Sequence, residues 1–116
     1  MENLLDNLKL KIDKLINQYY EVELKILSFK PPKILKLTPT ERFFVKELIE
    51  ELNIYKSESN KVIRVLINDN RISNLTSTKE LINFLGQLKI KMVSSIDFLN
   101  IIIKSNEKFD RLAGED

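Results

Sequence analysis

An apolar stripe runs through the first thirty residues and constrains the fold more than any other feature of the chain. Large apolar side chains recur at alternating spacings of three and four, at Leu5, Leu8, Ile12, Leu15, Tyr19, Val22, Ile26 and Phe29. This spacing places them on one side of an α-helix and is typical of helices that pack lengthwise on another helix. A helix over residues 2–28 is about 40 Å long at ~1.5 Å per residue. The sequence therefore predicts a long N-terminal helix with one apolar face.

The remainder of the chain is short compared with this stripe. With 116 residues, the chain holds one ordinary domain or two very small ones. A hairpin with a second, shorter helix covers only part of the stripe, so we expect the rest to pack against another protein subunit. Tyrosine suits such an interface because its ring is apolar and its tip is polar. The predicted partner interface consists of Leu8, Ile12, Leu15, Tyr19, Val22 and Ile26.

Composition excludes several kinds of chemistry. The chain has no cysteine and no histidine, so it contains no disulfide, no thiolate metal site and no Ser-His triad. The acidic residues occur in pairs, such as Glu50 and Glu51, that we expect on a helix surface. We therefore expect neither an enzyme nor a bound cofactor or metal. The net charge of +2 is too small to indicate nucleic-acid binding, and no signal peptide or membrane span is visible, so we expect a cytoplasmic protein.

A second helix has a clear start signal. Thr38 suits the N-cap, Pro39 the first helical position and Glu41 the third, where its carboxylate can bond back to the cap. We expect this helix to run to about Leu52. The residues before it, Lys30–Leu37, include two prolines and are predicted to be extended.

The second half of the chain has a different pattern, which predicts strands. Residues 55–60 are polar and are predicted to be a linker; Val62–Ile67 is rich in β-branched residues, and Leu88–Met92 alternates strictly between apolar residues and lysine. A helix is expected from Ser94 or Ser95 to Lys104. The predicted fold class is α+β, with a helical unit at 1–54, a linker at 55–60 and a small β-rich unit at 61–116. An all-α fold is the alternative.

Two further patterns suggest contacts with nucleic acid. Lys89 and Lys91 lie on the solvent-facing side of the predicted strand. There they either prevent wrong pairing at an exposed sheet edge or contact phosphate. Val45–Arg64 can be aligned with a helix-turn-helix motif that has Asn53 in its turn. In that interpretation the protein is a DNA-binding regulator that dimerises through its N-terminal helix, and residues 62–67 are helical instead of extended.

The order of segments resembles the GINS family of replication proteins. Leu15–Ile26 followed by Leu37–Leu48 is similar to the end of the family's helical A-domain. Lys61–Ile67, Leu85–Val93 and Ser95–Ile102 are similar in layout to its β-rich B-domain, closed here by Glu107–Leu112. The resemblance implies a non-catalytic scaffold subunit that assembles with sister subunits and links the MCM helicase to a RecJ-like partner, near the nucleoid. A small helical interaction or inhibitor protein of viral or plasmid origin is the remaining alternative.

Overall fold

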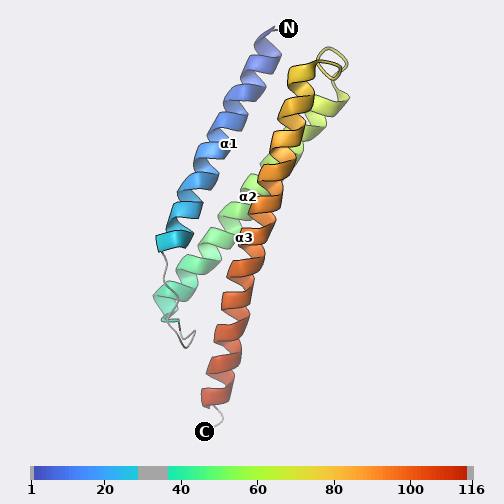
Figure 1. Ribbon diagram of the computed structural model, residues 1–116. Coiled ribbons are helices and arrows are strands. Elements are labelled where there is room, and N and C mark those ends of the chain that lie inside the picture. Colours follow the sequence, from blue (N-terminus) through green and yellow to red (C-terminus); the bar gives the residue numbers. More distant parts are fainter. Residues whose placement is uncertain (1, 29–36, 115–116) are drawn as a thin grey trace.

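The computed structural model describes residues 2–28 and 37–114 and contains three helices in that part of the chain (Figure 1). Helix α1 spans Glu2–Ser28, α2 spans Pro39–Asn68 and α3 spans Thr76–Gly114. α1 and α3 run in the same direction, and α2 runs in the opposite direction (Figure 1). The molecule is a rod with extents of 65 × 21 × 17 Å. Of the predicted extended connector, only Leu37 lies within the described residues, and it is buried.

The predicted N-terminal helix and the predicted start of the second helix are confirmed. α1 has the bounds that its stripe indicates. At the start of α2, Thr38 Oγ1 accepts a hydrogen bond of 3.1 Å from the Glu41 backbone N–H, and the Thr38 N–H donates to Glu41 Oε1 at 2.9 Å. This reciprocal capping box, with Pro39 beside it, satisfies amides that have no partner within the helix.

The predicted fold class is wrong, because the described residues form an all-α fold. α2 does not end near Leu52 but continues to Asn68, so the predicted linker at 55–60 and the predicted strand at 62–67 are parts of one helix. The buried residues explain why: Val45, Leu48, Leu52, Ser59, Val62 and Leu66 share one side of α2. Ser59 interrupts the apolar pattern but is fully buried, and its hydroxyl donates to the Tyr55 carbonyl at 2.8 Å. Continuous helix through Asn53 also excludes the predicted helix-turn-helix.

The strand predicted at 88–92 is likewise wrong. Thr76–Gly114 is one helix, which also contains the shorter helix expected from Ser94 or Ser95 to Lys104. In a strand Leu88, Ile90 and Met92 would share a face, but Leu88 and Met92 are buried while Ile90 is 67% exposed. Leu88 and Met92 are four residues apart and so lie on one side of a helix. The lysines between them are therefore not edge residues of a sheet.

A tight turn at residues 69–75 joins α2 to α3. Asp69 closes α2 as its C-cap, and its carboxylate accepts hydrogen bonds from the Arg71 backbone N–H and from the Arg71 guanidinium. These hydrogen bonds lower the pKa of Asp69 to about 2. The backbone N–H groups of Ile72 and Ser73 both donate to the Asp69 carbonyl, which fixes the reversal of chain direction. Ile72 is buried and connects the turn to the core.

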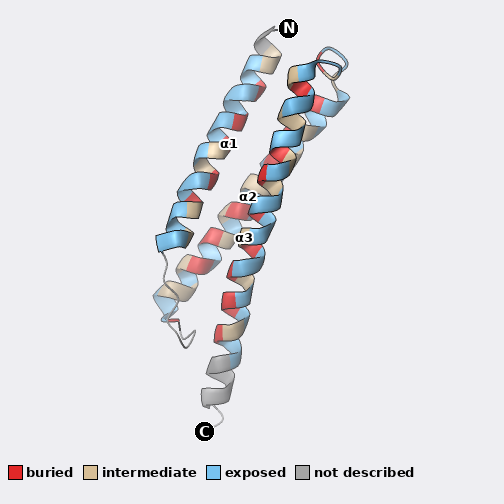
Figure 2. Ribbon diagram, in the orientation of Figure 1, coloured by how far each residue is buried: buried red, intermediate tan, exposed pale blue. Residues whose placement is uncertain are grey.

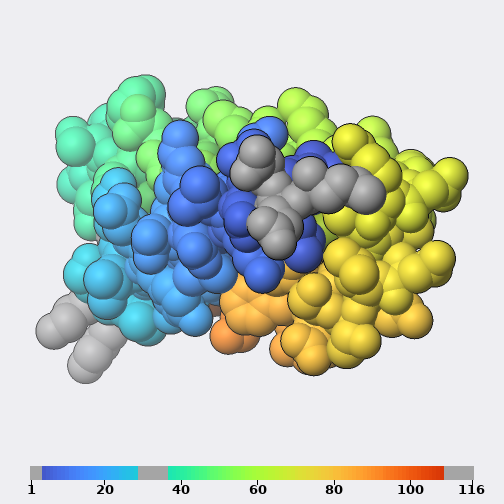
Figure 3. Space-filling view, turned by 90° about the horizontal axis from the view of Figure 1, so that it is seen from above, coloured from blue at the N-terminus to red at the C-terminus, as the bar shows by residue number. Residues whose placement is uncertain are grey.

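One apolar core runs the length of the rod, with buried residues on the facing sides of the three helices (Figure 2). α2 and α3 form the most extensive pair, and α1 packs mainly on α2. Seen from above, α1 lies against both of the other helices (Figure 3). Where α3 packs on the start of α2, Arg42 Nε donates to Oδ1 of the fully buried Asn106 at 2.9 Å. Thr78, also fully buried, has a hydroxyl without a hydrogen-bond partner.

Candidate functional site

The predicted partner interface on α1 lies in the core of the chain itself. Leu8, Ile12, Leu15, Tyr19 and Val22 are each exposed by 5% or less, and Ile26 is partly buried against the same core. The premise that this chain is too short to cover the stripe is wrong, because α2 and α3 are both longer than predicted. These side chains are therefore not available to a partner while the three helices stay packed.

Tyr19 shows how closely α1 is integrated into the core. Its ring is 2% exposed and lies 5.9 Å from the ring of Tyr20, centroid to centroid. Burial raises the pKa of the Tyr19 phenol, a side-chain hydrogen bond with Ser95 lowers it, and the nearby Glu23 carboxylate raises it further. The polar tip that suggested an interface is thus in contact with α3 of the same chain.

The structure does not bring Lys89 and Lys91 together. Two residues apart on a helix, they lie on nearly opposite sides of α3. Lys89 lines a hollow with Gly86, Ile90, Val93 and Ser94, whereas Lys91 lines a separate small pocket with Tyr20 and Phe84. They therefore do not form one phosphate site.

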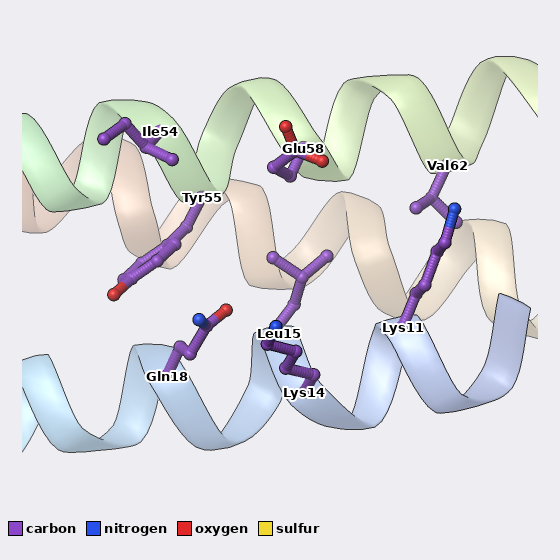
Figure 4. A pocket seen from close by; sticks show the side chains of 8 residues that line it. All are labelled: Lys11, Lys14, Leu15, Gln18, Ile54, Tyr55, Glu58 and Val62. Atoms are coloured by element: carbon purple, nitrogen blue, oxygen red, sulfur yellow. The ribbon is translucent and has the colours of Figure 1, made fainter.

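A groove of about 310 Å³ lies between α1 and α2 (Figure 4). Leu15 and Val62 contribute apolar surface, and Lys11, Lys14, Gln18, Ile54, Tyr55 and Glu58 complete its lining. The Tyr55 ring lies between the two helices, with its hydroxyl on the side of Gln18 (Figure 4). Burial raises the pKa of Tyr55, and the carboxylates of Glu51 and Glu21 raise it further. Because lysines and carboxylates both surround the groove, it does not select a ligand of one charge.

The outer face of α3 carries the strongest candidate for a binding surface. We use this name for Lys79, Asn83, Gly86, Ile90, Val93, Asp97 and Ile101, which succeed one another at spacings of three and four. Ile90 is 67% exposed, Ile101 is 61% exposed and Val93 is 40% exposed. At their centre, a Cβ added at Gly86 would meet nothing within 4 Å beyond its chain neighbours and the nearby backbone of its own helix. A surface hollow of about 360 Å³ lies beside Gly86 and Ile90.

Sequence reasoning missed this face because Ile90 was assigned to a strand. The apolar residues of this face can be recognised in the sequence once the buried positions of α3 are set aside. Leu85, Leu88, Met92, Ile96 and Leu99 follow the spacing of the buried side. What remains is a second, sparser series of apolar residues and one glycine, and it has the same helical period.

Comparisons with protein-family models, with curated proteins and with solved structures found no match for this chain. Among the described residues, no helix is long and apolar enough to cross a bilayer, and no group of acidic side chains is arranged to hold a metal ion.

Proposed function

We propose that this protein is a non-catalytic helical interaction module and that the outer face of α3 is its binding surface, which receives a helix from another protein molecule. The observation that carries the proposal is the exposure of Ile90 beside the hollow at Gly86. An exposed isoleucine beside a glycine forms a ridge next to a groove on the helix surface. Helices pack by placing the ridges of one in the grooves of the other.

Scattered apolar residues on a protein surface need no explanation. On the outer face of α3, Ile90 and Val93 occupy successive positions and Ile101 lies on the same side of the helix beyond Asp97. Exposed apolar residues aligned on one side of a helix support docking of a partner helix. α3 is held along its opposite side by the core, so the surface is preformed and little ordering entropy is lost on binding.

Of the alternatives raised by the sequence, the small helical interaction protein agrees best with an all-α fold. The role as a replication scaffold stays a prediction, and it has lost one support, since the β-rich unit that the resemblance implied is helical in the described residues. The cytoplasmic location stays a prediction as well.

The proposal is tested by measuring the size of the protein in a lysate of its source on a density gradient. We expect the wild-type chain to sediment faster than a 13.6 kDa monomer, and we expect Ile90→Asp to return it to monomer size. Leu10→Asp is the matched control, because Leu10 on α1 is also 67% exposed but lies on a different helix. Both variants should keep the wild-type circular dichroism spectrum.

Two results contradict the proposal. One is a wild-type chain that sediments as a monomer in the lysate and also when purified at high concentration. The other is an equal response to Ile90→Asp and Leu10→Asp, which would mean that the effect follows surface hydrophobicity in general and not the outer face of α3.

A further inference from the structure

The outer face of α3 is complementary to itself when its direction is reversed. We propose that this face binds the same face of a second copy of the chain, with the two α3 helices antiparallel and a two-fold axis at the level of residue 88. This inference rests on the proposed function and names the partner.

The first support is the spacing of the residues. From Lys79 to Asp97 the residues of the face follow one another at steps of four, three, four, three and four residues. This series is the same from either end, and Leu75 before the helix and Ile101 lie four residues beyond its two ends. Two copies can therefore lie antiparallel with every position of the face opposite another position of the face. An interface between identical surfaces related by a two-fold axis requires this property.

The second support is the chemistry of the positions that this alignment pairs. Lys79 of one copy lies opposite Asp97 of the other, and the symmetry repeats this pair of opposite charges at the other end. Leu75 lies opposite Ile101, and both side chains are exposed and apolar in the single chain. Charges of opposite sign on either side of an apolar centre fix the register and direction of an association more than they strengthen it.

The third support is the shape at the centre. Gly86 of one copy lies opposite Ile90 of the other, so each exposed isoleucine meets the hollow left by a glycine. Apart from its chain neighbours and the nearby backbone of its own helix, nothing lies within 4 Å of the position of a Cβ at Gly86. A glycine at such a position lets the two helix axes approach to about 8 Å, the short end of the usual range.

A parallel arrangement of the same two faces lacks these matches. It places Lys79 beside Lys79 of the other copy, and Asp97 beside Asp97 of the other copy. It also sets the two Ile90 side chains against each other and leaves the two Gly86 hollows facing each other. Like charges that meet across an interface oppose association, so the observed pattern selects the antiparallel direction.

The dimer is expected to be reversible. The paired faces extend over about 40 Å of one helix, at ~1.5 Å per residue. A single pair of helices lies at the small end of interface sizes, so a dissociation constant on the order of micromolar is expected. The two copies of Lys89 lie on the same edge of the pair, close to the axis, and their repulsion also limits the affinity.

Sedimentation velocity of the purified full chain tests the inference over concentrations from about 1 µM to about 1 mM. We expect the wild-type mass to rise from monomer towards dimer. Lys79→Asp alone and Asp97→Lys alone should each weaken the dimer at least about tenfold, since each places like charges at both symmetric pairs. The double variant, and an equimolar mixture of the two single variants, should restore it. Lys46→Asp, on the exposed side of α2, is the control and should change nothing.

A second variant tests the central hollow independently of charge. Gly86→Leu fills the space that Ile90 of the other copy is proposed to occupy, and the position of its Cβ is open in the single chain. It should weaken the dimer while keeping the helical circular dichroism signal.

The inference is overturned if the wild-type chain remains a monomer at every concentration, or if neither the double variant nor the mixture restores what the single variants lose. A monomer in the purified state together with an Ile90-dependent larger size in the source lysate would overturn the dimer but not the proposed function, because the partner would then be a different protein. If the purified chain is a monomer and Ile90→Asp does not change its size in the lysate, both the dimer and the proposed function are contradicted.

Discussion

Gly86→Ala is expected to stabilise the fold, although glycine at this position serves the proposed interface. Gly86 lies in the first third of α3, well inside the helix, where glycine costs about 0.9 kcal/mol relative to alanine because its backbone loses more freedom on folding. The added methyl group meets nothing within 4 Å beyond its own stretch of helix, so no steric cost offsets this gain. The free energy of unfolding should therefore increase by about 0.9 kcal/mol.

The corresponding shift in Tm follows from the size of the chain. With 116 residues and an unfolding entropy of about 2.1 cal/mol/K per residue, a gain of this size raises Tm by about 4 °C. Urea and thermal unfolding should be followed by circular dichroism at low micromolar concentration, where association contributes least. Repeating the scan at a tenfold lower concentration checks that Tm does not depend on association.

Ser94→Gly is the matched control, because Ser94 is exposed and lies on the same helix. It should lower the free energy of unfolding by about 0.5 kcal/mol, the difference between the two helix propensities. An unchanged or lower Tm for Gly86→Ala would refute the reasoning. It would mean either that the helix is not continuous at this residue or that the space beside it is filled.

Three further substitutions test the core and the turn. Thr78→Val should raise the free energy of unfolding by about 1 kcal/mol, because it removes a buried hydroxyl that has no hydrogen-bond partner; a decrease in urea-melt stability would contradict this. Leu15→Asp should abolish the helical circular dichroism signal of the whole chain and not of α1 alone. A buried unpaired charge costs more than about 4 kcal/mol, and all three helices share this core. A cooperative unfolding transition that remains in the variant would argue that the helices form separate folding units. Asp69→Asn should make stability depend less on pH in acid. Hydrogen bonds from Arg71 depress the pKa of Asp69 from 3.8 to about 2, so the stabilisation by this carboxylate is complete above pH 3.8 and is lost as the pH falls towards 2. The wild-type Tm should therefore fall more steeply than that of the variant in this window.

Local signals in the sequence predicted the start of α2 and the whole of α1. The capping box at Thr38 and the stripe from Leu8 to Val22 depend only on residues within a few turns, and the structure contains both. These features are local in their physics, so a single sequence is enough to find them.

The error at residues 55–60 came from a polar residue at a core position. Ser59 is fully buried and continues the pattern of α2, but its hydroxyl made residues 55–60 resemble a linker. Its hydrogen bond to the Tyr55 carbonyl is what allows a helix to bury it there. Once α2 was taken to be too short, the α1 stripe seemed uncovered, and a partner interface was predicted on residues that the chain itself buries.

The strand at 88–92 was a different error. Alternation over five residues fits a strand, but Leu88 and Met92 also fit one side of a helix, and only the environment of Ile90 separates the two cases. The candidate site depends on this same residue. It could not be predicted before the burial of its neighbours was known, because an exposed isoleucine is recognised only by comparison with a core.

The Arg42–Asn106 hydrogen bond has a consequence for how the chain avoids misalignment. Helices with long, uniform apolar stripes can pair out of step by one heptad, about 10 Å, and still bury similar side chains. In the native alignment the buried Asn106 amide meets the Arg42 guanidinium across 64 residues of sequence. A shifted pairing of α2 and α3 would leave the Asn106 amide in the core without this donor. This polar contact at one end of the rod therefore raises the free energy of shifted alignments relative to the native one.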